Sequence, residues 1–175
     1  MSFQTVLDEV SVGYAPRLIA EVSQYLAQSG LTIAVAESVT GGMLGEALTT
    51  YPGGSEYFMG GVICYSNALK VKLAQVNPAT IAAHGVVSEA VTREMVDGIH
   101  RLTGASIALA TNGVAGPHPV GQSEVGTVIL GVRFQHDVII KRLEIEGNRT
   151  VVRQRATLAA FGILKQWLMS QQKGD

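Results

Sequence analysis

Short apolar runs alternate along the chain with longer segments whose apolar residues recur at helical spacing. Three of the runs are continuous and bounded by glycine or polar residues, which is typical of strands buried on both faces of a sheet. Two later runs are β-rich and flank a short polar segment, a pattern that indicates an antiparallel hairpin. The predicted strands are residues 31–36, 59–65 and 105–111 and, in the hairpin, 125–132 and 138–145 with 133–137 between them.

Segments with apolar residues three and four positions apart separate these strands and predict amphipathic helices. Ser66 and Asn148 are suited to begin a helix, Pro78 to a first helical turn, and Gly30 and Gly85 to a stop. The helices are expected at residues 15–27, 43–48, 67–73, 78–84, 88–102 and 149–167. Strands that alternate with helices in this way predict an open, mostly parallel α/β sheet, which the hairpin extends at one side.

The first strand runs directly into a turn that carries polar side chains and two glycines. Ser38 lies at the mouth of the turn, and Thr40 precedes Gly41 and Gly42, which open the next helix. Such a turn exposes backbone N–H groups and the positive end of a helix dipole, which favour a phosphate, a carboxylate or a developing oxyanion. The turn alone is equally compatible with a structural role, in which Ser38 or Thr40 caps the helix and the glycines only permit close packing.

A second turn of this kind follows the strand at residues 105–111, and it begins with Asn112 and Gly113. In an open α/β sheet the ligand crevice lies beyond the carboxyl ends of the strands, so turns after different strands converge on one site. We therefore expect the segments around Ser38 and Asn112 to lie side by side. Residues 51–55 are dense in turn formers and predict a loop that can lie over such a site.

Length and charge limit the classes of protein to which the chain can belong. A chain of 175 residues can bury one core without disulfides or metals and predicts a single domain, with residues 1–12 and 171–175 peripheral. A formal net charge of −1 and scattered basic residues give no electrostatic footprint for nucleic acid. Only 15% of the residues are charged and 47% are hydrophobic, which favours a buried subunit interface and predicts a homodimer or larger homo-oligomer.

The single cysteine, Cys64, lies inside an apolar run, which indicates a buried structural thiol rather than a nucleophile. One cysteine allows neither a disulfide within the chain nor a cysteine-based metal site. The first residues lack the basic and apolar regions of a secretory signal, and no apolar run approaches the roughly 18 residues of a membrane span. We therefore expect a cytoplasmic protein with no membrane partner.

Six short motifs occur in the order in which a known family carries them. They are Ala36-Glu-Ser-Val-Thr-Gly-Gly42, Gly61-Val-Ile-Cys-Tyr-Ser-Asn-Ala-Leu-Lys70, His84-Gly-Val-Val-Ser88, Gly113-Val-Ala-Gly-Pro117, Val125-Gly-Thr-Val128, and Gly147-Asn-Arg149 with Arg153. On these motifs nearly the whole chain resembles the CinA C-terminal domain family. The resemblance implies a three-layer α/β/α sandwich, usually dimeric. It also implies a nicotinamide mononucleotide deamidase, which forms nicotinate mononucleotide and ammonia and needs no metal or other cofactor.

The resemblance also assigns roles to individual residues. By the resemblance, Ser38 is the nucleophile and Lys70 the base; from its own place in the sequence, Tyr65 is expected to orient the lysine or to donate a hydrogen bond. The remaining candidates bind the substrate through backbone N–H groups, polar side chains or guanidinium groups suited to phosphate: Glu37, Thr40, Gly41, Gly42, Asn112, Gly113, Arg149 and Arg153.

The chemistry of the pair agrees with this assignment. A serine hydroxyl is a poor nucleophile until a base takes its proton, and a lysine is such a base only when burial or nearby positive charge lowers its pKa from about 10.4. Lys70 lies beside an apolar strand end, where that condition can be met. Without the resemblance, Lys70 would be interpreted as a solvated helix residue, and Arg149 and Arg153 as a solvated face.

Four features depart from the pattern of the family. Val39 stands where the family has Cys, Asn112 where it has Ser or Thr, and Asn148 where it has Asp. The loop at residues 118–124 is shorter and lacks the Gly-Gly and Lys-Pro of the pattern. Two functions therefore remain open: an amidohydrolase that acts through an acyl-Ser38 intermediate, or a relative that binds a nucleotide or phosphate compound without turnover. The retained polar residues disfavour a purely structural or partner-binding domain.

Overall fold

The computed structural model describes residues 14–171, and the segments predicted to be peripheral fall, apart from Gln171, outside them. Within the described residues five strands form one sheet in the order β2-β1-β3-β4-β5. The strands are β1 (Ile33–Glu37), β2 (Phe58–Ile63), β3 (Ile107–Gly113), β4 (Thr127–Phe134) and β5 (Asp137–Glu144). The helices are α2 (Tyr14–Ser29), α3 (Met43–Thr49), α4 (Gly54–Tyr57), α5 (Asn67–Lys72), α6 (Pro78–His84), α7 (Glu89–Thr103) and α8 (Arg149–Gln171).

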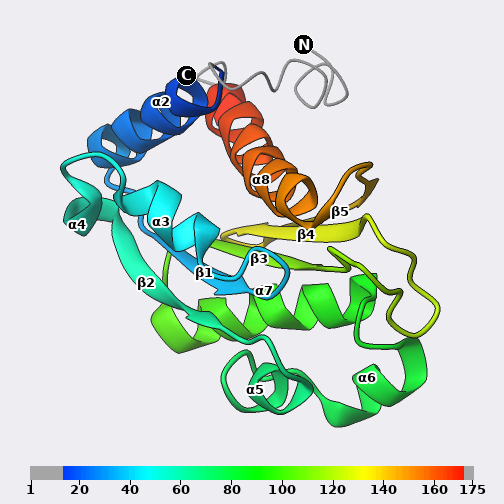
Figure 1. Cartoon of the computed structure of the whole chain (residues 1–175). Coiled ribbons are helices and arrows are strands. Elements are labelled where there is room, and N and C mark those ends of the chain that lie inside the picture. The colour runs from blue at the N-terminus through cyan, green and yellow to red at the C-terminus, as the bar shows by residue number, and fades with distance from the viewer. Residues whose placement is uncertain (1–13, 172–175) are drawn as a thin grey trace.

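The sheet is parallel at one side and antiparallel at the other, which confirms the predicted mixed sheet and its hairpin. β1 pairs in parallel with both β2 and β3, whereas β4 lies antiparallel to β3 and to β5. The chain leaves β1 over one face of the sheet to reach β2, and it returns across the other face through α7 to reach β3 (Figure 1). The carboxyl ends of β1 and β3 therefore form the switch point at which open α/β sheets bind ligands.

Side chains of different size face the two sides of the parallel strands. Ile33 and Val35 belong to the core cluster that includes residues of α2 and α8, whereas Ala34 and Ala36 belong to the cluster that includes residues of α7. β3 repeats this alternation, because successive side chains of a strand point to opposite faces. Helices α2, α3 and α8 cover the bulky face and α7 the alanine face, which gives three layers (Figure 1).

Small residues let α7 lie close to the sheet and to the segment after α5. A Cβ added at Gly131 of β4 would lie 2.8 Å from Val96 Cγ2 of α7. A Cβ added at Gly98 of α7 would lie 1.8 Å from the carbonyl oxygen of Ala74. A side chain at either glycine would force α7 away from its neighbours, because protein interiors leave no room for an extra methyl group.

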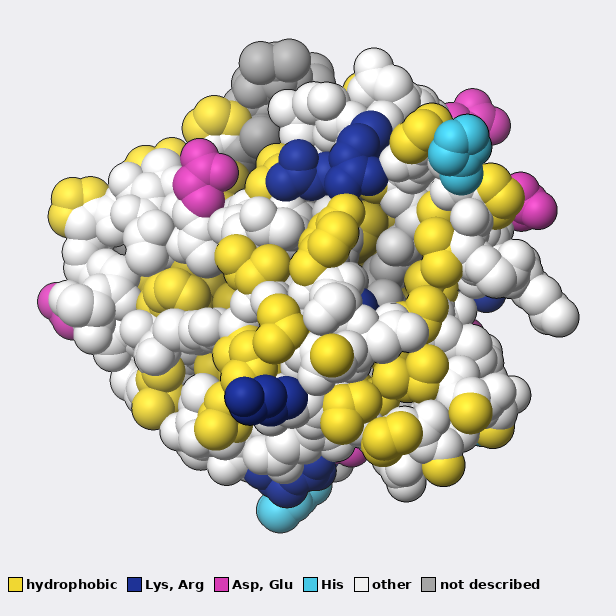
Figure 2. Space-filling view, turned by 60° about the horizontal axis from the view of Figure 1, so that its bottom comes forward, with side chains coloured by type: hydrophobic (Ala, Val, Ile, Leu, Met, Phe, Trp, Pro, Cys, Tyr) yellow, Lys and Arg dark blue, Asp and Glu magenta, His cyan; other side chains and the backbone are white. Residues whose placement is uncertain are grey.

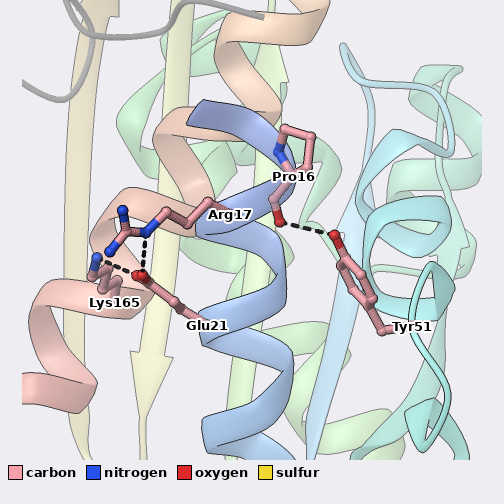
Figure 3. A network of polar contacts seen from close by, with 5 residues as sticks. All are labelled: Pro16, Arg17, Glu21, Tyr51 and Lys165. Atoms are coloured by element: carbon pink, nitrogen blue, oxygen red, sulfur yellow. Dashed lines mark hydrogen bonds and ion pairs between the residues drawn. The ribbon is translucent and has the colours of Figure 1, made fainter. Parts of the chain in front are cut away.

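Polar contacts hold α2 against α8 and against the segment that follows α3 (Figure 3). The Glu21 carboxylate accepts hydrogen bonds from Lys165 of α8 and from Arg17, and these bonds lower the pKa of the Glu21 carboxyl. The Tyr51 hydroxyl donates to the Pro16 carbonyl over 2.9 Å. Exposed ion pairs of this kind contribute typically less than about 1 kcal/mol each. Apolar burial between α2 and α8 therefore supplies most of the stabilisation there.

Helix α8, with 23 residues, lies across the bulky face. Asn148 begins it as predicted, since its Oδ1 accepts the Val151 N–H at 3.1 Å. Further along, Trp167 stacks on Phe134 of β4 with 3.8 Å between the ring centroids. Neither α8 nor any other helix in the described part of the chain is long and apolar enough to cross a membrane.

The hairpin turn is shorter than the sequence predicts. β4 continues through Arg133 and β5 begins at Asp137, which leaves Gln135 and His136 as the turn. Arg133 stays in the strand because its guanidinium donates to Asp97 of α7 over 2.8 Å. Gln135 takes a positive φ of 51°, the conformation that a two-residue hairpin turn requires.

The prediction that residues 51–55 lie over the site is wrong. They lead into α4, which directly precedes β2. Because β1, β2 and β3 are parallel, a segment before β2 lies at the amino ends of these strands. The turns after β1 and β3 lie at the opposite edge of the sheet.

Candidate active site

Ser38 lies at the carboxyl end of β1, one residue beyond the strand. Its backbone N–H donates to the Thr111 carbonyl of β3 over 2.9 Å, so the pairing of the two strands continues into the turn. Only 6% of Ser38 is exposed. The hydroxyl is therefore held at a strand end, and the turns after β1 and β3 lie side by side as predicted.

The helix after this turn is capped by Glu37 rather than by a hydroxyl of the turn. Gly42, the residue that precedes α3, has no side chain to cap the helix. Instead, the Glu37 carboxylate accepts the backbone N–H groups of Gly42, Leu44 and Gly45 at 2.8, 3.1 and 2.9 Å. A carboxylate in this position satisfies N–H groups that a helix start leaves without partners, and it meets the positive end of the helix dipole. The Gly42 N–H is thus already used by the protein.

A pair of hydroxyls joins this carboxylate to β3. Thr40 Oγ1 donates to Glu37 Oε2 over 2.7 Å and lies 2.7 Å from Thr111 Oγ1. Since Thr40 uses its only proton on the carboxylate, the Thr111 hydroxyl is the donor in the second bond. All three side chains are buried. The sequence prediction missed Thr111, although a hydroxyl near the end of an otherwise apolar strand is a signal for such a network.

Lys70 reaches the serine from α5, the helix after β2. Ser66 caps this helix as predicted, accepting the Leu69 N–H at 3.2 Å. Lys70 is only 2% exposed, and its Nζ lies 2.8 Å from Ser38 Oγ and 3.0 Å from the Cys64 carbonyl oxygen. The alternative interpretation of Lys70 as a solvated helix residue is therefore wrong.

Burial lowers the pKa of the Lys70 amine, and the neighbouring Cys64 thiol opposes this shift only in part. No carboxylate of residues 14–171 lies within 4.0 Å of Lys70 Nζ. A neutral amine has two protons and one lone pair, so it can donate to the Cys64 carbonyl and accept the Ser38 proton at the same time. The surroundings thus favour the form of Lys70 that acts as a base.

Cys64 itself is the buried thiol that the sequence predicts. Burial raises the pKa of its thiol, which keeps it protonated and unreactive. The backbone of Cys64 contacts two residues of the site. Its N–H donates to the Glu37 carbonyl over 2.8 Å, and its carbonyl accepts a hydrogen bond from Lys70.

Arg149 spans the mouth of the site from the first turn of α8. Its Nη2 donates to the Tyr65 hydroxyl over 2.7 Å, and its Nη1 donates to the Gly116 carbonyl over 2.8 Å. No hydrogen bond joins Tyr65 to Lys70, and the lysine is held by the Cys64 carbonyl instead. Both partners of Arg149 are neutral oxygens, so an anionic ligand would form the stronger, charge-assisted bond.

Arg153, one turn further along α8, points to the turn after β1. Its Nη2 donates to the Thr40 carbonyl over 2.8 Å, and a Cβ added at Gly41 would lie 3.3 Å from that nitrogen. Gly41 and Gly42 both have positive φ, 58° and 106°, which glycine adopts without strain. Arg153 and the two glycines therefore shape the turn that carries the serine.

Asn112 is buried at the end of β3, and the protein uses both protons of its amide. Nδ2 donates to the Val86 carbonyl over 2.7 Å and lies 3.4 Å from Thr92 Oγ1. The side-chain oxygen accepts the Gly113 N–H at 3.0 Å. Asn112 can therefore offer a ligand only a remaining lone pair of its oxygen. Glycine at 113 is required by packing, since an added Cβ would lie 2.5 Å from a backbone carbonyl oxygen of β4.

A cavity of about 180 Å³ lies at the carboxyl ends of β1 and β3. Predicted site residues that line it are Ser38, Tyr65, Lys70, Asn112, Gly113 and Arg149, whereas Glu37, Thr40, Gly41, Gly42 and Arg153 do not. Further lining residues, which the sequence prediction missed, are Val39, Asn67, Val86, Val87, Ala115 and Val120. Figure 2 turns the side with α5 and α6 toward the viewer and shows a hollow among hydrophobic side chains, with Lys and Arg side chains gathered above it.

Asn67 is the polar residue among those lining residues that the sequence prediction missed. It lies in the first turn of α5, is exposed, and makes no side-chain hydrogen bond within residues 14–171. Its amide is therefore available to a ligand. In the described part of the chain, no group of three His, Cys, Asp or Glu residues is placed to hold a metal ion.

Residues 16–168 match the family model of the CinA C-terminal domain. The chain belongs to this CinA family. A CinA-like protein from Thermotoga maritima is 41% identical over 143 residues, which are 81% of this chain and 35% of that protein. Another, from Gemmatimonas aurantiaca, is 43% identical over 150 residues, or 85% of this chain and 35% of that protein. The chain thus spans about a third of the length of the curated relatives it matches.

CinA proteins of known structure share the fold. A CinA superfamily protein from Klebsiella pneumoniae has a TM-score of 0.85 and 33% identity, covering 89% of this chain and 98% of that chain. One from Escherichia coli has a TM-score of 0.84 and 26% identity, covering 87% and 90%. The mixed five-stranded sheet with its covering helices is therefore the CinA fold.

The departures from the CinA pattern have structural consequences that leave the serine and the lysine in contact. Val39 is buried and contributes to the apolar lining of the cavity. Asn148 caps α8 without a charge, and Arg149 takes neutral oxygens as partners. In the shortened loop, Val120 and Ser123 pair through two backbone hydrogen bonds of 3.0 Å.

Proposed function

We propose that the chain hydrolyses a carboxamide, with Ser38 as nucleophile and Lys70 as base. The observation that carries the proposal is the 2.8 Å contact between Lys70 Nζ and Ser38 Oγ, because a buried lysine with no carboxylate partner is suited to take the serine proton. The resemblance to the CinA family supplies the substrate of this proposal, nicotinamide mononucleotide, and the products, nicotinate mononucleotide and ammonia.

In the proposed reaction, the neutral Lys70 amine accepts the Ser38 proton as Oγ attacks the carboxamide carbon. The tetrahedral intermediate collapses when its C–N bond breaks, and the lysine returns the proton to the departing nitrogen, which leaves as ammonia. Water then attacks the acyl-serine, again with Lys70 as base, and the lysine returns that proton to Ser38 Oγ as the ester C–O bond breaks, which releases the carboxylate and regenerates the hydroxyl. Lys70 thus carries one proton from Ser38 to the departing nitrogen in the first half of the reaction and one from water to Ser38 in the second.

The lining of the cavity supports a substrate with an apolar ring and an anionic end. Val39 and Val87 offer an apolar surface beside the serine, and the Asn67 amide can bond the carboxamide oxygen. Arg149, at the exposed mouth, can exchange its two neutral partners for a phosphate. The backbone N–H groups of residues 40–42 are less suited to the oxyanion, because the Gly42 N–H is bonded to the Glu37 carboxylate.

A second candidate function is binding of a nucleotide or phosphate compound without turnover. Asn112 favours it, because the amide is consumed by contacts within the protein and presents no proton to a ligand. The first function requires the carboxamide carbon of the ligand to lie in reach of Ser38 Oγ, whereas the second requires only that an anionic group of the ligand binds Arg149.

Measuring ammonia release and binding of the mononucleotide on the same samples distinguishes the two candidate functions. Purified protein is incubated with nicotinamide mononucleotide, with nicotinamide and with unrelated amides. We expect ammonia from the mononucleotide alone, and a loss of at least about a thousandfold in Ser38→Ala. Ser29→Ala, an exposed serine at the end of α2, is the matched control. Binding of the mononucleotide without ammonia would establish the second candidate, and turnover that persists in Ser38→Ala would refute the mechanism.

We also infer that the protein is a homodimer joined through β2 and α5. β2 is an edge strand, and Met59, Ile63, Tyr65 and Leu69 are among the exposed large hydrophobic residues. Residues 57–69 contain no charged side chain, so two copies related by a twofold axis would meet there without like-charge repulsion.

A further inference from the structure

The loop between α6 and α7 forms one wall of the cavity. Val86 and Val87 of this loop line the cavity together with Ser38 and Lys70. Val87 belongs to a small apolar cluster with Val114 and Ile129, and Val86 packs against the same cluster. The loop therefore presents apolar side chains to whatever group is attached to the carbon that Ser38 would attack.

Side chains from two other segments bind the backbone of this loop. The Asn112 amide donates to the Val86 carbonyl over 2.7 Å, and the Ser123 hydroxyl donates to the Val87 carbonyl over 3.2 Å. Both donors are buried, at 1% and 8% exposure. Two adjacent carbonyls of an irregular loop are thus fixed from β3 and from the shortened loop after it.

The length of the asparagine side chain matters for the first of these contacts. Its amide nitrogen lies one bond further from Cα than a serine or threonine hydroxyl, so the shorter residues cannot reach the Val86 carbonyl from the same backbone position. The second amide proton points to Thr92 Oγ1 of α7 at 3.4 Å. Asn112 therefore fixes the loop between the strand end and the start of α7.

We propose that Asn112 is a positioning residue that sets the width of the cavity beside Ser38 by holding Val86, with Ser123 as a second tie on Val87. Through this wall it selects acyl groups that are flat or unbranched next to the reacting carbon, as an aromatic ring is, over acyl groups that are branched there. The inference rests on the proposed nucleophile, and it concerns which acyl groups reach that nucleophile rather than how they react.

The test compares two uncharged esters that differ only in acyl bulk, p-nitrophenyl acetate and p-nitrophenyl pivalate. Ser38 Oγ would attack the ester carbon and pass its proton to Lys70, and the ester C–O bond would break to release p-nitrophenolate, leaving the acyl group on the serine. In Asn112→Ser we expect the pivalate-to-acetate ratio of kcat/KM to rise roughly tenfold, the scale of one lost hydrogen bond. Ser123→Ala should shift the ratio in the same direction by a smaller factor.

The control is Asn77→Ser, the same substitution at the residue that caps α6. Asn77 accepts the Ala79 N–H and does not line the cavity, and serine can replace it as a cap. The ester ratio should stay constant in this variant. Hydrogen exchange of the peptide that covers residues 85–88 should become roughly tenfold faster in Asn112→Ser and not in Asn77→Ser.

The outcomes separate this inference from the proposed function. An unchanged ester ratio, with a normal Ser38-dependent release of p-nitrophenolate, overturns the role of Asn112 alone. A changed ratio with unchanged exchange at residues 85–88 shows that Asn112 contacts the acyl group directly, which overturns the action through Val86. Release that does not depend on Ser38 overturns the proposed nucleophile, and the selection of acyl groups with it.

Discussion

Replacement of Lys70 by methionine tests whether the amine is held in a surrounding that disfavours its charge. Methionine has nearly the same length and no charge. The Lys70 side chain is 2% exposed, so the folded protein must remove water from the ammonium whenever the amine is protonated. Methionine abolishes that cost, but it also removes the contacts with Ser38 and with the Cys64 carbonyl.

These two effects oppose each other near neutral pH. Removing an ammonium from water costs several kcal/mol even after the protein relaxes. A buried carbonyl left without a partner costs about 1–3 kcal/mol. We therefore expect Lys70→Met to unfold with at least the wild-type free energy at about pH 7, a result that a loss of hydrogen bonds alone would not give.

The difference between the two proteins must also change with pH. Because burial lowers the pKa of Lys70 in the folded state, the unfolded chain binds more protons in the window between the folded pKa and the unfolded value of about 10.4. Wild-type stability therefore rises with pH through that window, by at most about 1.4 kcal/mol for each pH unit. The methionine variant has no such contribution.

Urea unfolding at several pH values between about 7 and 10 measures this difference. Across this pH range we expect the free energy of unfolding of the wild type to rise by at least about 1 kcal/mol relative to that of Lys70→Met. Both proteins carry Cys64→Ala in this comparison, because burial raises the pKa of the Cys64 thiol and the charge of Lys70 opposes that rise, so the thiol would not cancel from the difference. Lys72→Met, an exposed lysine on the same helix, should give a constant difference. A Lys70→Met difference that does not vary with pH would refute the argument for a neutral base.

Three further predictions concern the fold and the assembly. Glu37→Gln should lower the free energy of unfolding by about 1–3 kcal/mol in urea titrations, because the carboxylate accepts four hydrogen bonds, while Glu46→Gln on the exposed side of α3 should change little. Gly98→Ala should cost more than about 2 kcal/mol in the same assay, since its Cβ meets a carbonyl oxygen; an unchanged midpoint would contradict the packing of α7. Light scattering at micromolar concentration should give twice the chain mass of 18.5 kDa, and Ile63→Lys should halve it; a wild-type monomer would exclude the proposed dimer.

The periodicity of the sequence predicts the fold well because most elements are decided locally. The apolar runs that become β1 and β3 are buried on both faces, and Ser66, Asn77 and Ser88 cap the three helices between β2 and β3. The ends of the hairpin could not be predicted in the same way. Arg133 looks like a turn residue in the sequence, and its place in β4 depends on a contact with an aspartate on α7, far away in the chain.

In the candidate site, too, the features decided locally could be predicted from the sequence, and those that depend on contacts between remote segments could not. The turn after β1 and the capped start of α5 are visible in the sequence, and the resemblance to CinA connects Ser38 with Lys70. The partners of the other polar residues depend on distances through space. Tyr65 bonds Arg149 instead of the lysine, and Asn112 bonds a loop rather than a ligand, because these partners come from segments that are remote in sequence.

The alternation of β1 explains how an acidic residue can stand next to the nucleophile without disturbing the base. Glu37 lies on the same face of β1 as Ile33 and Val35, because side chains two positions apart in a strand share a face. Its carboxylate therefore lies on the side covered by α3, where backbone N–H groups hold it. Ser38 follows Ala34 and Ala36 at the same spacing, so its hydroxyl lies on the alanine face, where it contacts Lys70. A carboxylate beside Lys70 would favour the ammonium and raise the pKa of the amine. Placing the two neighbours on opposite faces of the strand therefore stabilises the turn with a negative charge and leaves the lysine without one.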